Sequence, residues 1–339
     1  MSLAELAAKN VKDTLAIAMD HKGEHPAIVV ADERTELSRL LFRAYSEGLP
    51  TARHISFDQM APEAVKAELE ALEAQALVVL VQSSVLRMPE FRTRVELYRR
   101  GVKVIEHSNL ERMEPHEIEY YVAAMAYDPA YYRDIGHALK ARVDVAQSAR
   151  IESDGEVLHY GALEEAKLNI GDFAGLKNIG SQFPIGEVFT EARVLESVHG
   201  RTKIYGFADT AFKLNLPPEP ITLVIEAGRI VDTVNSTSEF DQVLALIREG
   251  EGEVWVRELG FGMNRAFSRE RTVADVGAFE RVCGVHLSLG ARHGVYKKPQ
   301  LNHRENRYHV DSFVITDRVL LDDAVVYDHG EFTLTSAAS

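Results

Sequence analysis

Short apolar runs alternate with amphipathic stretches through the first third of the chain. Four runs have the length and the β-branched content of buried strands, at residues 26–31, 52–56, 76–81 and 102–105. The spacing between them predicts amphipathic helices at residues 32–46, 62–73 and 91–100. Asp32 or Thr35 is expected to cap the first of these helices. Strands that alternate with helices predict a parallel sheet with helices on both faces.

The pattern changes in the middle of the chain. Residues 113–149 have a mostly helical pattern, and we expect this segment to bridge the two halves. From residue 150 onward, short strands are separated by turn signals. The segments 221–226 and 229–234 flank Ala227-Gly228 and predict a β-hairpin, and residues 240–248 predict an isolated helix.

These patterns predict a two-part fold. Residues 1–149 are expected to form an α/β domain with a parallel, Rossmann-like sheet. Residues 150–339 are expected to form an α+β domain with mainly antiparallel strands. The ends of the predicted parallel strands carry neither a G-x-G-x-x-G motif nor a phosphate-binding P-loop, so the sequence does not support a nucleotide site there.

Composition narrows the class of protein. The chain has 339 residues, of which 46% are apolar and 27% charged, which is ordinary for a soluble globular protein. The net charge of −14, from 38 basic and 52 acidic residues, argues against a nucleic-acid partner. No apolar run approaches the roughly 18 residues of a membrane-spanning helix, so we expect no membrane partner. The single cysteine, Cys283, favours a reducing compartment and hence a cytoplasmic location.

Candidate chemistry is concentrated in the second half of the chain. His309 and Asp311 are two residues apart in the apolar, aromatic segment 308–315, so on a strand both would point to one face. Glu187 follows a Pro/Gly turn, Glu258 ends an apolar strand before glycines, and His286 lies in a small, apolar run. Buried carboxylates and imidazoles need a charged partner or a metal.

Each of these residues also has a purely structural interpretation. Glu187 could cap a turn, Glu258 could pair with a neighbouring arginine, and His286 could be a hydrogen-bonded core histidine. His309 and Asp311 could form a hydrogen-bonded pair on a solvated strand face. Together, however, the five residues supply three carboxylates and two imidazoles. This is the ligand inventory of a dinuclear site, in which a bridging carboxylate holds two cations about 3.5–4 Å apart. Nitrogen and oxygen ligands without thiolate suit Zn, Co or Mn, and also non-haem Fe.

The same segments resemble the metal-binding motifs of a known family. Residues 184–190, 258–260, 286–290 and 309–311 are similar, in order and rough spacing, to those of the aminopeptidase T and aminopeptidase S family of metallo-aminopeptidases. The resemblance covers residues 180–331 well and the first half only in outline.

The resemblance implies a co-catalytic exopeptidase that removes N-terminal residues from short peptides. Glu187, Glu258, His286, His309 and Asp311 would bind two divalent metal ions, and a bridging water would attack the scissile carbonyl. Glu187 and Glu258 are both candidates for the general base. Members of the family are usually dimeric, so a homodimer is expected.

One position departs from the family pattern. The family has a tyrosine seven residues after the His286 position, where this chain has His293. We expect His293 to replace it, as a hydrogen-bond donor or as a further ligand. Alternatively, the site has drifted to other chemistry.

Two other classes of protein stay open. The scaffold also resembles the 2,5-dihydroxypyridine 5,6-dioxygenases, which open aromatic rings at a single Fe(II). A facial triad of His286, His309 and Asp311 would suit that ion. Glu258 and His286 match the motifs of the peptidases, so they favour the dinuclear hydrolase over the dioxygenase. The third alternative is a binding protein whose metal site is vestigial or structural.

Overall fold

The chain forms two compact units. The computed structural model describes residues 1–84, 86, 88, 92–299, 301 and 307–334. The first unit consists of Met1–Pro129, Gly171–Ile185 and Arg271–Ala278, and the second of Ala130–Ile170, Gly186–Glu270 and Phe279–Ser339.

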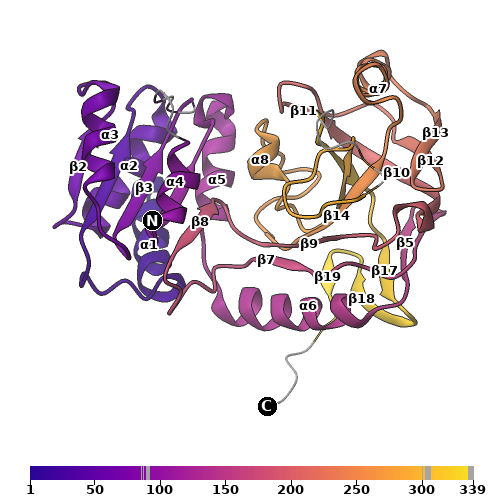
Figure 1. The fold of residues 1–339 in the computed structure, drawn as a ribbon, viewed down its shortest axis with the longest axis horizontal. Coiled ribbons are helices and arrows are strands. Elements are labelled where there is room, and N and C mark those ends of the chain that lie inside the picture. Colours follow the sequence, from indigo (N-terminus) through magenta and orange to yellow (C-terminus); the bar gives the residue numbers. More distant parts are fainter. Residues whose placement is uncertain (85, 87, 89–91, 300, 302–306, 335–339) are drawn as a thin grey trace. The chain divides into compact units, whose positions relative to one another are not determined.

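A parallel sheet organises the first unit (Figure 1). Its strands are β1 (Ala27–Ala31), β2 (Arg53–Ser56), β3 (Leu77–Val81), β4 (Lys103–His107) and β8 (Ile179–Gln182), in the order β2-β1-β3-β4-β8. All four pairings are parallel. The helices of this unit include α1 (Leu3–Asp13), α2 (Glu36–Gly48), α3 (Pro62–Glu70), α4 (Thr93–Arg99) and α5 (Ile118–Ala124). The sequence prediction of a parallel α/β part is therefore confirmed.

Burial on both faces explains the continuous apolar strands of this sheet. Every residue of β3 is buried. Val30, Val78 and Leu80 belong to one core cluster together with Val65 of α3 and Leu97 of α4. Thr35 caps α2 by accepting a hydrogen bond from the backbone N–H of Ser38. Asp32 instead accepts from the backbone N–H of Ser83 at 2.6 Å.

The second unit is built on one large antiparallel sheet. Its main path runs β19-β18-β17-β5-β6-β10-β16-β15-β14-β9-β7, and β11, β12 and β13 branch from β10. Its strands are β5 (Ala149–Ser153), β6 (Glu156–Tyr160), β7 (Lys167–Asn169), β9 (Glu187–Glu191), β10 (His199–Ala208), β11 (Leu214–Asn215), β12 (Ile221–Glu226), β13 (Arg229–Val234), β14 (Val256–Gly262), β15 (Gly284–Leu289), β16 (Val310–Val314), β17 (Arg318–Leu321), β18 (Ala324–Asp328) and β19 (Glu331–Phe332). Its longer helices are α6 (Gly136–Val145) and α7 (Ser238–Glu251). The antiparallel second part of the prediction is confirmed.

The predicted hairpin and isolated helix both form. β12 and β13 pair around Ala227 and Gly228, whose φ angles of 46° and 77° are the positive values that a tight hairpin turn requires. The helix predicted at 240–248 is α7, which is longer because Thr237 caps it. Apolar periodicity and turn residues are local properties of the chain, so the sequence could predict both the hairpin and the helix.

The middle of the chain differs from the prediction. The helical segment expected at 113–149 divides into α5, the π-helical turn Ala130–Ile135 and α6, and β5 begins at Ala149. The break lies at residues 125–128, and Pro129 begins the next helical stretch, where proline is tolerated because the first N–H of a helix has no partner within it. The helix predicted at 91–100 is α4, and Phe91 lies outside the described residues.

The units also differ from the single boundary expected at residue 149/150. Residues 130–149 group with the second unit, while β8 returns to the first sheet and pairs in parallel with β4. Parallel pairing joins strands that are distant in sequence, so a linear change of pattern does not reveal it.

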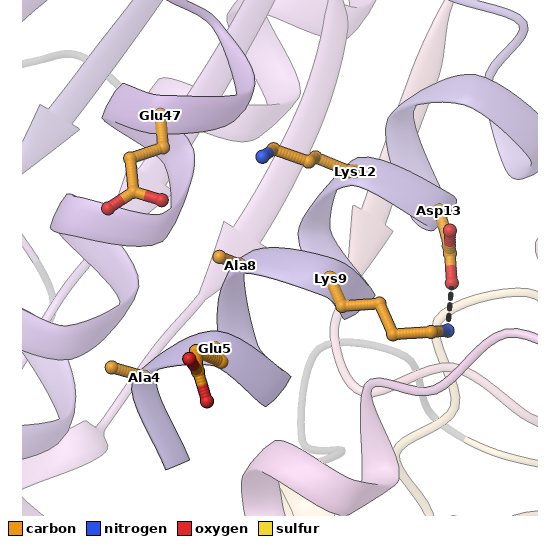
Figure 2. A pocket seen from close by; sticks show the side chains of 7 residues that line it. All are labelled: Ala4, Glu5, Ala8, Lys9, Lys12, Asp13 and Glu47. Carbon is orange, nitrogen blue, oxygen red and sulfur yellow. Dashed lines mark hydrogen bonds and ion pairs between the residues drawn. The ribbon is translucent and has the colours of Figure 1, made fainter. Parts of the chain in front are cut away.

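A hollow of about 430 Å³ lies on the first unit, against α1. Figure 2 shows the side chains that line it. Lys9, Lys12, Asp13 and Glu47 give it both signs of charge, and Lys9 pairs with Asp13 at 2.6 Å. Within the described part of the chain, none of the helices has both the length and the hydropathy needed to span a membrane.

Candidate metal centre

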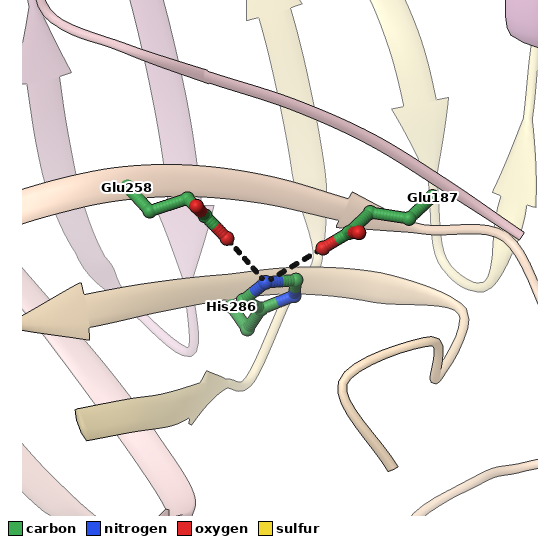
Figure 3. A group of neighbouring side chains, drawn as sticks. All are labelled: Glu187, Glu258 and His286. Carbon is green, nitrogen blue, oxygen red and sulfur yellow. Dashed lines mark hydrogen bonds and ion pairs between the residues drawn. The ribbon is translucent and has the colours of Figure 1, made fainter. Parts of the chain in front are cut away.

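Three adjacent strands of the antiparallel sheet bring two carboxylates and one imidazole together. Glu187 begins β9, Glu258 lies in β14 and His286 lies in β15, with β14 between the other two strands. One ligand atom from each residue lies within 4.8 Å of the other two, and all three residues are buried. His286 Nε2 is 3.3 Å from Glu187 Oε1 and 3.3 Å from Glu258 Oε1 (Figure 3).

The register of β14 creates the space for this cluster. Gly260 pairs with His286, and Gly262 pairs with Glu187. Glu258, Gly260 and Gly262 share one face of the strand because side chains alternate. A Cβ atom at Gly260 would lie 2.1 Å from His286 Nε2, so only glycine leaves room for the ring.

His309 and Asp311 form a second pair on the adjoining strand. Asp311 lies in β16 opposite Ser288, two residues along β15 from His286. His309 Nε2 is 3.1 Å from Asp311 Oδ1. The strand begins at Val310 rather than at residue 308 as expected, so His309 lies just before it. Its Nδ1 hydrogen-bonds the carbonyl oxygen of Arg292 at 3.2 Å, which leaves Nε2 directed at the carboxylate.

His293 contacts the cluster through Glu258. Its Nε2 lies 2.8 Å from Glu258 Oε2. Its Nδ1 accepts hydrogen bonds from the backbone N–H groups of Val295 and Tyr296, at 3.1 and 3.3 Å. Because Nδ1 is an acceptor, Nε2 carries the proton and donates to the carboxylate. This geometry makes His293 a donor that orients Glu258. Its expected replacement of the family tyrosine, as a donor to the reacting group or as a further ligand, stays a prediction.

Sequence reasoning missed two charged neighbours of the cluster. Arg281 donates to Glu187 Oε2 at 2.6 Å and lies 2.7 Å from Glu280 Oε1, and its side chain is buried. A buried guanidinium offsets part of the negative charge that the acids concentrate there. The available signal was the adjacent Glu280-Arg281 pair in the apolar segment before His286.

Opposite charges inside the cluster shift the pKa values of its members. Burial alone would raise the pKa of Glu258, but hydrogen bonds from His286 and His293 outweigh it and hold that pKa well below its ordinary value. Burial lowers the pKa of His309, yet the nearby negative charge of Asp311 raises it to about 10. Burial, opposed by Arg281, raises the pKa of Glu280 to about 8. Burial would lower the pKa of His286, but its hydrogen bonds with Glu187 and Glu258 raise it well above the ordinary value.

The donor set fits a divalent cation. Two carboxylate oxygens and an imidazole nitrogen already converge, and among the described residues no other group of three such ligands does so. Asp311 Oδ1 is buried without a hydrogen bond of good geometry from the described residues, although His309 Nε2 lies near it. His309 and Asp311 are not part of this converging group. Of the five expected ligands, the structure therefore brings Glu187, Glu258 and His286 closest together.

The fold and the cluster define a class of protein: a parallel α/β unit joined to an antiparallel unit that carries a buried carboxylate–imidazole centre. No protein-family model matches the chain, and no curated protein matches it in sequence.

Solved structures do share its fold. A 2,5-dihydroxypyridine dioxygenase from Pseudomonas putida KT2440 matches with a TM-score of 0.66 and 15% identity, over 99% of both chains. Wild-type AmpT from Thermus thermophilus matches with a TM-score of 0.59 and 14% identity, over 98% of this chain and all of AmpT. At these identities the similarity establishes a related fold. It does not transfer an activity.

Proposed function

We propose that the protein is a metal-dependent hydrolase that removes N-terminal residues from short peptides. The observation that carries the proposal is the convergence of Glu187, Glu258 and His286 on one point, with two carboxylates to one imidazole. This oxygen-rich set suits the cations of hydrolytic sites better than it suits a facial triad of two histidines and one carboxylate.

Glu187, Glu258 and His286 would hold one cation, and His309 and Asp311 would contribute to a second. When bound, such cations lower the pKa of a water and polarise a carbonyl. Arg281 fixes Glu187 from the side away from His286, and His293 fixes Glu258 in the same way. Each glutamate thus presents one oxygen to His286 while the other is held, which is the arrangement expected of oriented ligands.

The second candidate function is Fe(II)-dependent opening of a dihydroxypyridine-like aromatic ring. Its support is the dioxygenase that shares this fold over 99% of the chain. His286, His309 and Asp311 would then form the triad. A small-molecule or peptide substrate, a homodimer, a cytoplasmic location and independent folding of the two units remain predictions.

The deciding experiment counts metal atoms in the purified protein and then assays both reactions. We expect about two Zn, Co or Mn per chain, and release of the N-terminal residue from a short peptide but not from its N-acetylated form. Glu258→Gln should lower metal affinity by roughly 100-fold or more, because even partners of metal ligands cost 10–100-fold. The exposed Glu249→Gln on α7 is the matched control.

Other outcomes reject the hydrolase. One Fe per chain with oxygen uptake on dihydroxypyridine would favour ring cleavage. A chain that binds no cation after reconstitution, or a Glu258→Gln variant with unchanged metal content and activity, would reject the site itself.

A further inference from the structure

Two histidines face each other across neighbouring strands outside the Glu187 cluster. His159 of β6 and His199 of β10 are directly paired in the antiparallel register. Their rings are nearly parallel, with centroids 5.2 Å apart and an interplanar angle of 16°. His199 is exposed and His159 is partly exposed, so water and small ions reach both rings.

The ring of His199 is already oriented. Its Nδ1 lies 3.0 Å from the carbonyl oxygen of Ser197, and a carbonyl oxygen can only accept a hydrogen bond. Nδ1 therefore carries the proton, and the lone pair is on Nε2. A backbone carbonyl that holds one ring nitrogen is the usual partner of a metal-binding histidine. In the described part of the chain, no hydrogen bond uses His199 Nε2 or either ring nitrogen of His159.

Local charges favour the neutral form of His159. Burial, the charge that His199 would carry and the nearby Arg150 together lower the pKa of His159. Arg150 is opposite His159 on β5, but its guanidinium lies 3.1 Å from Glu152, which offsets its repulsion of a cation. The cross-strand pairing thus places two imidazoles side by side on the sheet surface, and rotation about their side-chain bonds would bring both lone pairs to one ion.

We propose that His159 and His199 form a cross-strand chelate for a divalent cation of borderline softness. Imidazole ligands select Cu²⁺, Ni²⁺ and Zn²⁺ over Mg²⁺ and Ca²⁺, and the expected order of affinity places Cu²⁺ first. Cross-strand neighbours have Cβ atoms about 4.5–5.5 Å apart, a separation that two imidazoles can close around one ion. Water completes the coordination, because among the described residues the pair does not gain a third histidine, cysteine or carboxylate ligand.

The site is tested by counting bound Ni²⁺ on metal-stripped protein by isothermal titration calorimetry. We expect His159→Ala and His199→Ala each to bind one Ni²⁺ fewer per chain than the wild type. The double variant should lose no more than either single variant, because one ion needs both rings. His329→Ala, which changes an exposed histidine beside Asp328, should leave the count unchanged.

The test does not depend on the proposed hydrolase. Glu258→Gln would remove the buried site and leave the His159–His199 site. The loss of one site can therefore be told apart from the loss of the other. Mg²⁺ should not compete with Ni²⁺ at the chelate. Equal Ni²⁺ counts for the wild type and the folded single variants would overturn the proposal, as would the same loss in His329→Ala.

Discussion

The absence of a side chain at Gly260 is as important to the candidate centre as the ligands themselves. The imidazole of His286 occupies the place where a Cβ of residue 260 would lie. The position of the His286 ring thus depends on the absence of a side chain at the residue opposite it on the neighbouring strand. At the scale of single residues, the glycine specifies the site as much as the charged residues do.

Gly260→Ala should displace His286 and abolish cation binding at the cluster. The fold should lose about 1–3 kcal/mol of unfolding free energy through overpacking. Gly206→Ala, in β10 of the same sheet, is the control, since a Cβ there meets the movable ends of Leu214 and Leu216 at 3.2–3.3 Å. Calorimetric titration with Zn²⁺ checks the prediction, and unaltered binding by Gly260→Ala would contradict the assigned role of His286.

His107 is a second residue whose surroundings determine its chemistry. It is fully buried at the end of β4, and it hydrogen-bonds the hydroxyls of Tyr45 and Tyr121 at 2.7 and 2.8 Å. Tyr121 donates to the carbonyl of Phe183, so it accepts from His107 Nδ1, and Nε2 accepts from Tyr45. Both nitrogens are used by the neutral ring, and burial lowers the pKa of His107 to about 3.

The first unit should therefore lose stability on acidification. In the unfolded chain a histidine binds a proton near pH 6.5, whereas folded His107 binds it only near 3. Between these values the unfolded state binds more protons, so the free energy of unfolding falls as the pH falls, by up to about 1.4 kcal/mol per pH unit.

His107→Gln isolates this effect, because an amide keeps a donor and an acceptor but does not titrate. Burial raises the pKa of Asp275 to about 6, which stabilises the same unit in acid and partly masks the trend. The difference between wild type and variant in urea unfolding, measured from pH 7 to pH 4, removes that contribution. A difference that does not change with pH would show that His107 is not buried as a neutral ring.

At the scale of elements, the guanidinium of Arg257 connects β14 both to β9 and to the loop that carries His293. Arg257 Nε donates to Glu191 Oε2 at 2.8 Å, and both side chains are almost fully buried. The same guanidinium donates to the carbonyl oxygens of Ala291 and Tyr296, on either side of His293. Lys298 lies 3.2 Å from the second oxygen of Glu191. The residue before Glu258 thus holds the loop whose histidine orients Glu258.

Arg257→Met should release this loop and leave the buried negative charge of Glu191 with less positive charge to offset it. We expect a loss of about 3 kcal/mol of unfolding free energy, because removing one partner of a buried pair strands the other charge. Amide hydrogen exchange at residues 291–298 should accelerate. Arg201→Met, which removes the more exposed partner of Glu156, should cost no more than about 1 kcal/mol. Unchanged exchange in the loop would contradict the connection.

At the scale of the whole molecule, the candidate centre belongs to one unit only. Glu187, Glu258, His286, His293, His309 and Asp311 all lie in the antiparallel unit. The parallel unit has its own core and its own buried polar network around His107. A cation that binds the folded centre therefore stabilises the antiparallel unit directly.

Hydrogen exchange with and without Zn²⁺ tests this localisation. At a free concentration of about 100 times its Kd, a ligand stabilises the fold it binds by about 2.7 kcal/mol. We expect this stabilisation to slow amide exchange in β9, β14, β15 and β16, with little change in β1 and β3. Protection that is equal in both units would show that they unfold as one, and protection confined to β1 and β3 would place the cation elsewhere.

The sequence alone determined the features that depend on local periodicity. The alternation of apolar runs and amphipathic helices predicted the parallel unit, and the turn at Ala227-Gly228 predicted the hairpin. It also singled out Glu187, Glu258 and His286, because acids and imidazoles in apolar strands need a partner wherever those strands lie.

Only the tertiary structure decided which of these groups meet. The order of β9, β14, β15 and β16 in the sheet places three ligands within reach and leaves His309 and Asp311 as a neighbouring pair. The return of β8 to the parallel sheet, the guanidinium of Arg281 against Glu187 and the proton on His293 Nε2 all depend on long-range pairing. Local sequence signals propensity and burial, whereas strand neighbours and register are fixed by the packing of the whole sheet.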